Sequence, residues 1–148
     1  MKRLIATAIM GVLAAPVLAG SDGGDAAKGE KGFKKCKACH AIVADDGTVI
    51  VKGGKTGPDL YGVAGRAVGS TDYKYGSGLK ALGEAGAVWD EESFTAYLKD
   101  PKKYVQKELD DKKAKVKMSF KLKKGGEDIY AYLVSVGPAM AEEEGESN

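Results

Sequence analysis

Two cysteines and one histidine stand together in the chain, as Cys36-Lys37-Ala38-Cys39-His40. They are the only cysteines and the only histidine among the 148 residues. The spacing C-x-x-C-H indicates covalent attachment of a c-type haem. Two cysteines three positions apart at a helix end share one face, where both thiols can form thioethers to the haem vinyl groups. The histidine that follows can then reach the iron as an axial ligand. The motif therefore predicts a haem bound by Cys36, Cys39 and His40.

Other chemistries could use the same three residues. A thioredoxin-like redox pair of Cys36 and Cys39 usually accompanies a βαβ pattern, which this sequence lacks. A four-ligand zinc site needs more cysteines and histidines than the chain has, and so does a scaffold of several disulfides. A single structural disulfide would not need His40. Haem attachment is the interpretation that uses all three residues.

A second axial ligand can be sought among the four methionines. Met1 and Met10 lie in a segment that we expect to be removed, and Met140 lies beyond the helix stop at Gly137-Pro138. Met118 remains, in a loop between two expected helices, and its soft sulfur suits haem iron and raises the reduction potential. Met118 could instead be an ordinary packing residue. A lysine is the competing ligand, and the candidates are Lys115, Lys117 and Lys121.

The coordination of the iron separates two functions. An iron held by both His40 and Met118 has no open position, and it suits a one-electron carrier. An iron whose sixth ligand is absent or easily displaced suits a haem enzyme or a gas-binding protein. A third possibility, a thiol redox protein without haem, predicts a colourless protein.

The elements that must position these residues are short helices separated by long loops. Apolar spacing and capping residues predict the helices. They are expected over 26–39, about 77–82, from Asp90 to Asp100-Pro101, from Pro101 onward, and over about 126–136. A short strand is expected at 49–51, within a loop over 41–65. With so few core residues, a large apolar cofactor should fill the centre.

Residues 1–19 are expected to be a cleaved signal peptide. Lys2 and Arg3 precede an apolar run of about 15 residues, too short to span a bilayer, and Val17 and Ala19 fit a signal peptidase site. Export predicts a periplasmic protein. The mature domain is expected over 20–137, followed by an acidic, disordered tail over 138–148.

The charge of the mature chain is balanced but unevenly distributed. The precursor has 23 Lys and Arg against 21 Asp and Glu, and removal of Lys2 and Arg3 leaves 21 of each. Residues 99–124 hold eleven lysines and four acids, and the tail holds four glutamates. Such a neutral chain is not typical of nucleic-acid binding. The lysine-rich stretch fits either a docking patch for an acidic protein or a solvated surface.

The sequence resembles the class I cytochromes c, and in particular the cytochrome c2 group of alphaproteobacteria, over nearly all of the mature chain. Besides the haem motif, K-T-G-P-D-L-Y-G at 55–62 resembles the family's T-G-P-N-L-x-G segment. K-M-S-F at 117–120 resembles its methionine loop. Gly29 with Phe33, and Ile129 with Tyr132 and Leu133, resemble its two terminal helices, which cross near Gly29. The resemblance implies an all-α fold of four to five short helices around one covalent haem c.

The resemblance also implies roles for individual residues. The carbonyl of Pro58 would accept a hydrogen bond from His40 Nδ1. Arg66 would lie near a haem propionate. Tyr97 would lie behind the methionine ligand. Tyr75 and Trp89 would donate to a propionate. The chain departs from the family at two positions, Asp59 in place of the usual Asn and Val116 in place of a frequent Thr.

A member of this group would be a soluble, monomeric one-electron carrier, not an enzyme. It would take electrons from a cytochrome bc1 complex and pass them to a photosynthetic reaction centre or a terminal cytochrome oxidase. It would not insert stably into a membrane or bind nucleic acid. Docking would use a ring of lysines around the exposed haem edge, and the expected members are Lys35, Lys37, Lys99, Lys102, Lys103, Lys117, Lys121 and Lys123.

Overall fold

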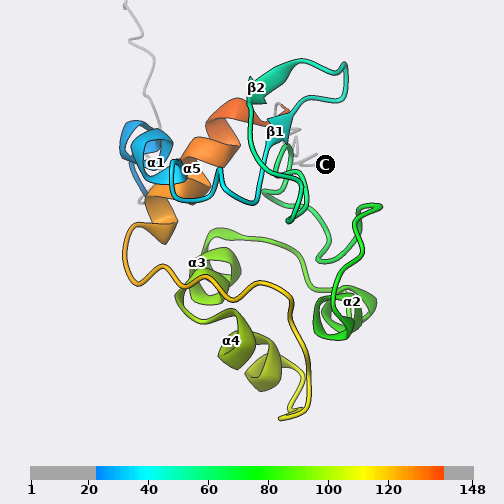
Figure 1. The fold of residues 1–148 in the computed structure, drawn as a ribbon. Coiled ribbons are helices and arrows are strands. Elements are labelled where there is room, and N and C mark those ends of the chain that lie inside the picture. The colour runs from blue at the N-terminus through cyan, green and yellow to red at the C-terminus, as the bar shows by residue number, and fades with distance from the viewer. Residues whose placement is uncertain (1–22, 139–148) are drawn as a thin grey trace, which may run out of the picture.

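The computed structural model describes residues 23–138, which form five helices and one two-stranded antiparallel sheet (Figure 1). The expected signal peptide, and the expected acidic tail after Pro138, lie outside the described residues. In chain order the elements are α1 (Ala26–Phe33), β1 (Ile42–Val43), β2 (Val49–Val51), α2 (Ser77–Glu84), α3 (Glu91–Lys99), α4 (Pro101–Glu108) and α5 (Gly126–Val136).

The two terminal helices, α1 and α5, cross in close contact (Figure 1). A Cβ atom added to Gly29 would lie 1.9 Å from the Asp128 carbonyl oxygen and 2.7 Å from Tyr132 Cβ. Only glycine therefore allows the backbones to approach this closely. The rings of Phe33 and Tyr132 pack beside the crossing with centroids 5.7 Å apart. The crossing near Gly29 that the resemblance implied is confirmed.

Capping residues fix the starts of α3 and α4. The Asp90 carboxylate accepts a hydrogen bond from the Ser93 backbone amide at 2.7 Å, and the Asp90 amide donates to Ser93 Oγ at 3.0 Å. This reciprocal pair is a capping box. Asp100 accepts from the Lys103 amide at 3.1 Å, and Pro101 occupies the first turn of α4. The boundaries predicted at Asp90 and at Asp100-Pro101 are confirmed.

The helix predicted over 26–39 is too long, because α1 ends at Phe33 and tight turns follow. The Cys39 amide donates to the Cys36 carbonyl at 3.1 Å, three residues back, in place of the helical four. The loop after the sheet donates hydrogen bonds to carbonyls of these turns. The amide of Gly54 donates to Lys37 at 2.9 Å, and that of Gly57 donates to Cys39 at 2.8 Å.

The strand predicted at 49–51 is β2, and its partner β1 was not predicted because two residues carry no periodic pattern. Ile42 pairs with Val51 in the antiparallel register. The helix predicted at 77–82 is α2, which continues to Glu84. The C-terminal helix has the bounds that the apolar spacing predicts.

The core lies between the crossed terminal helices and the pair α3 and α4. Its side chains include Phe33, Ile42, Val68, Trp89, Phe94, Tyr97, Val105, Ile129, Tyr132 and Leu133. Among residues 23–138, no helix combines the length and the apolar character needed to cross a membrane.

Candidate functional site

The orientation of the His40 ring is fixed by one hydrogen bond. Its Nδ1 lies 2.7 Å from the backbone carbonyl oxygen of Pro58, which can only accept. Nδ1 therefore carries a proton, and in the neutral imidazole this leaves Nε2 with the lone pair that a metal needs. The contact between His40 and Pro58 is the one that the resemblance implied. Both residues are partly buried.

Gly57 provides the space for this ring. A Cβ atom at Gly57 would lie 2.3 Å from His40 Cε1, 2.6 Å from Nδ1 and 2.8 Å from Nε2. Real Cβ atoms are not found at such distances, so any other residue would push the imidazole out of place. The Gly57 amide also donates to the Cys39 carbonyl at 2.8 Å, which joins this segment to the haem motif. The sequence showed a Gly-Pro turn here but not its steric role.

The two cysteines lie in the turns directly after α1, and they do not form a disulfide with each other. Cys36 is partly buried and Cys39 is exposed. Burial, followed by the neighbouring Cys39, raises the pKa of the Cys36 thiol to about 11. A redox-active thiol pair needs a lowered pKa and a populated thiolate. The arrangement therefore disfavours the thioredoxin-like alternative.

Asp59 and Arg66 hold the segment that presents Pro58. The Asp59 carboxylate accepts from the Val43 amide at 3.0 Å through Oδ2 and from the Tyr61 amide at 2.8 Å through Oδ1. Arg66 donates to the carbonyls of Tyr61 at 2.9 Å and of Asp59 at 3.3 Å. Asparagine, with one acceptor oxygen, could not accept both amides in this way. The departure at Asp59 thus has a structural use.

Trp89 joins Arg66 to an aromatic cluster. The Trp89 amide donates to the Arg66 carbonyl at 2.9 Å, and its ring centroid lies 5.0 Å from that of Tyr97 and 6.5 Å from that of Tyr104. Burial, and the neighbouring phenols, raise the pKa of Tyr97 well above its ordinary value. Tyr75 pairs its hydroxyl with that of Thr71 at 2.6 Å.

Met118 lies in the loop between α4 and α5, partly buried and packed against the core. Val116 packs against the same core, so the valine at this departure replaces a hydroxyl with an apolar contact.

Two neighbours of this loop were missed as site residues. Lys117 was considered only as a docking or competing ligand residue, and Tyr73 was not singled out because no motif contains it. Tyr73 donates to the Thr56 carbonyl, and Lys117 donates to that of Lys74.

The residues present fit a covalent haem. Two unpaired thiols stand in one turn, an imidazole has a free Nε2, and a glycine leaves room for its ring. A bare metal ion is less well served, because within residues 23–138 no group of three or more Cys, His, Asp or Glu residues is placed to bind one.

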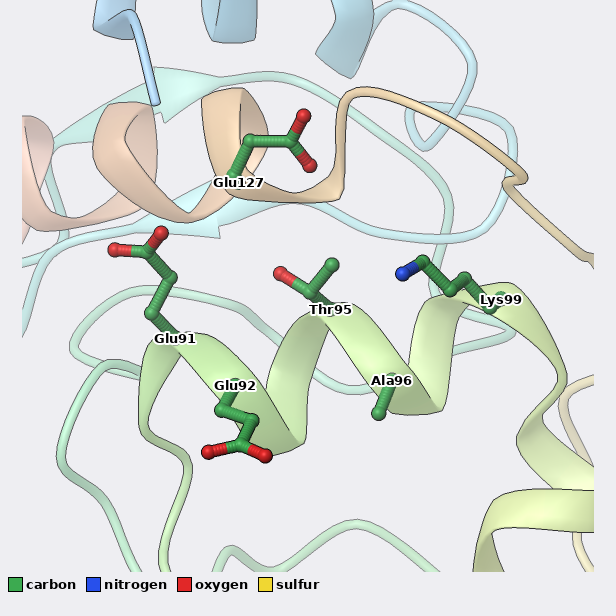
Figure 2. Close-up of a pocket in the computed structure, with 6 residues that line it drawn as sticks. All are labelled: Glu91, Glu92, Thr95, Ala96, Lys99 and Glu127. Carbon is green, nitrogen blue, oxygen red and sulfur yellow. The ribbon is translucent and has the colours of Figure 1, made fainter. Parts of the chain in front are cut away.

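A separate pocket lies between α3 and α5 (Figure 2). Glu91 and Thr95 point from α3 toward α5, which contributes Glu127. Of the predicted site and docking residues, Lys99 alone lines it, together with three glutamates, Glu91, Glu92 and Glu127. Because none of the proposed haem residues lines it, this pocket is not the haem site.

The helical arrangement and the Cys-x-x-Cys-His turn define a class I cytochrome c. No protein-family model matches the chain. It is 59% identical over 126 residues to cytochrome c2 of Rhodobacter capsulatus, covering 84% of this chain and 89% of that one. It is 55% identical over 137 residues to cytochrome c-551 of Roseobacter denitrificans, covering 92% and 96%.

The fold agrees with that similarity. The solved structure of Rhodobacter capsulatus cytochrome c2 matches with a TM-score of 0.75 and 60% identity, covering 76% of this chain and 98% of that one. The chain therefore belongs to the cytochrome c2 family. Members of this family are electron carriers, and the expected fold class is confirmed.

Proposed function

We propose that this chain is a periplasmic one-electron carrier with a single covalent haem c. Cys36 and Cys39 would each add a thiol across one haem vinyl group. His40 and Met118 would supply the two protein ligands of the iron. The haem, when bound, supplies an iron that gains or loses one electron without a change in its ligands.

The observation that carries this proposal is the orientation of His40. His40 directly follows Cys39 in the sequence. Its ring is held at Nδ1 by the Pro58 carbonyl and confined by Gly57. A histidine with its proton fixed on Nδ1 presents Nε2 as a metal ligand. Free surface histidines have no need of such a cradle.

Arg66, Tyr75, Trp89 and Tyr97 would complete the environment of the haem. The guanidinium of Arg66 already donates two hydrogen bonds, so it is held rigidly and offers a fixed positive charge to a propionate. Trp89 and Tyr97 are buried against each other. They would exclude water from the methionine side, which favours retention of Met118 at the iron.

The proposed cellular location and partners are supported by the expected signal peptide and by the family. We propose that residues 1–19 direct export and that the mature protein works in the periplasm. It would accept electrons from a cytochrome bc1 complex and deliver them to a photosynthetic reaction centre or a cytochrome oxidase. Exposed lysines in and beside the haem motif, such as Lys37 and Lys35, would steer it to acidic surfaces on those complexes.

The first test is the visible spectrum of the reduced mature holoprotein with and without carbon monoxide. We expect a haem spectrum that carbon monoxide does not change, because both axial positions are filled. A clear shift would mean an accessible iron, and would favour an enzyme or gas-binding protein. A colourless product from a host able to attach haem would contradict the haem proposal. Substitution of Met118 by Ala should make the iron sensitive to carbon monoxide.

A further inference from the structure

A second set of contacts joins the two segments that carry the proposed iron ligands, and the roles described above do not use it. The amine of Lys117 donates a hydrogen bond to the backbone carbonyl of Lys74 and lies 5.7 Å from the centroid of the Tyr73 ring. The hydroxyl of Tyr73 donates in turn to the carbonyl of Thr56. Three segments far apart in the sequence thereby meet around one tyrosine.

The two ends of this connection, Lys117 and Thr56, each directly precede a residue of the candidate haem site. Lys117 directly precedes Met118. Thr56 directly precedes Gly57, which confines the His40 ring. Because backbone neighbours cannot move independently, a restraint on Lys117 and Thr56 is also a restraint on the segments that present both proposed ligands.

The segment that carries Tyr73 makes further contacts within itself. The rings of Tyr73 and Tyr75 pack edge to face with centroids 5.1 Å apart, and Tyr75 pairs with Thr71 at 2.6 Å. The Tyr73 side chain is partly buried, and its hydroxyl meets the Thr56 carbonyl at the exposed surface. Lys117 is exposed, and its contact with the ring face adds a cation–π attraction to the hydrogen bond.

We propose that Tyr73 and Lys117 are positioning residues that together tie the Met118 loop to the segment that orients His40. Neither would ligate the iron. Their contacts hold the methionine loop closed, so that an outside ligand can displace Met118 only by breaking them. This inference rests on the proposed function, because it assumes that Met118 is the sixth ligand.

The test uses the ferric holoprotein and imidazole as the outside ligand, with methionine ligation followed through its long-wavelength absorption band. Tyr73→Phe removes the hydroxyl and keeps the ring, and Lys117→Ala removes the amine. Tyr61→Phe is the control for the first, because its hydroxyl has no hydrogen bond to the described residues and the ring is also partly buried. Lys123→Ala is the control for the second, with the same change of charge in the same loop.

We expect each of the two test variants to bind imidazole about two- to tenfold more tightly, the range that corresponds to one net hydrogen bond. The double variant should bind no more tightly than the stronger single variant, because two contacts in series fail when either is lost. Lys117→Arg, which keeps the charge and the donor, should restore affinity close to that of the native protein. Both controls should leave it unchanged.

Equal imidazole affinity in Tyr73→Phe, Lys117→Ala and their controls would overturn the positioning role and leave the proposed function standing. Absence of the methionine band in the native protein would instead overturn the proposed ligation. Hydrogen exchange of residues 115–120 then decides the positioning role by itself. Faster exchange there in Tyr73→Phe, which alters no atom of that loop, supports the connection, and unchanged exchange rejects it.

Discussion

At the residue scale, the site depends on small side chains as much as on chemically active ones. Gly57 contributes no functional group, yet the His40 ring occupies the volume that its Cβ would fill. The two carboxylate oxygens of Asp59 accept from the backbone amides of Val43 and Tyr61. These bonds attach the segment that contains Pro58 to strand β1 and to the turn that follows. The imidazole is thus oriented both by steric confinement at Gly57 and by its hydrogen bond to the Pro58 carbonyl.

Replacement of Gly57 by Ala should therefore displace the His40 ring from Pro58. We expect the free energy of unfolding of the holoprotein to fall by about 1–3 kcal/mol, as for other overpacked sites. The reduction potential should change as well, because the hydrogen bond to Nδ1 tunes the ligand. Denaturant unfolding and redox titration measure the two effects.

Gly32→Ala is the matched control for that change. Its added Cβ would meet Ile129 Cγ1 at 3.5 Å, an ordinary contact, and its helical position suits alanine. The control should keep both the potential and the stability near native values. Equal behaviour of the two variants would contradict the steric role of Gly57.

The proposed haem residues come from the sequence, and the residues that support them come from it only in part. Cys36, Cys39 and His40 form a contiguous motif, and Met118 is the methionine that elimination favours as the sixth ligand. The Pro58 contact came from resemblance. Tyr73 could not be found, because its partner Thr56 is 17 residues away and no spacing rule connects them.

At the scale of elements, helix starts were predicted better than helix ends. Asp90 and Asp100 mark starts through local side-chain contacts that the sequence shows directly. After α1 ends at Phe33, the turns of the haem motif are joined instead to the amides of Gly54 and Gly57, which donate to the carbonyls of Lys37 and Cys39. Such tertiary contacts of backbone groups leave no local pattern.

The capping box of α3 gives a prediction that depends on pH. Asp90→Ala should lower the free energy of unfolding by about 1 kcal/mol at neutral pH, and Asp90→Asn by less, since Asn also caps. Hydrogen bonds from the backbone amide and then the side chain of Ser93 hold the pKa of Asp90 below its ordinary value of 3.8.

The sign of the pH effect follows from that lowered pKa. The ionised cap stabilises the fold above the ordinary value, and this contribution is lost as pH falls through the lower folded value. The stability difference between native protein and Asp90→Asn should therefore shrink below about pH 4. Thermal unfolding at several pH values measures it, and a difference that grows on acidification would contradict the role of the ionised carboxylate.

At the scale of the whole molecule, the distribution of lysines should control encounter with partners. Substitution of both Lys37 and Lys123 by Glu should slow electron transfer with a purified cytochrome bc1 complex at low ionic strength by about tenfold or more. The rate should also depend less on salt, because the attractive field is weakened.

The matched control replaces Lys80 and Lys112 by Glu, exposed lysines outside the expected docking ring with the same total charge change. Only a small effect is expected there. Lys99 is left out of both sets because it lines the pocket of Figure 2 together with three glutamates. If both double variants slowed the reaction equally, net charge would explain the effect and a local docking surface would be rejected.

The crossing of α1 and α5 turns the chain between them into a closed ring. The Asp25 amide donates to the Asp128 side chain at 2.7 Å across 103 residues, so the two sides of the crossing are fastened together. The entropic cost of closing this ring exceeds that of closing a ring of half the length by only about 0.6 kcal/mol of free energy. Once it is closed, the loops of the candidate haem site are held at both ends.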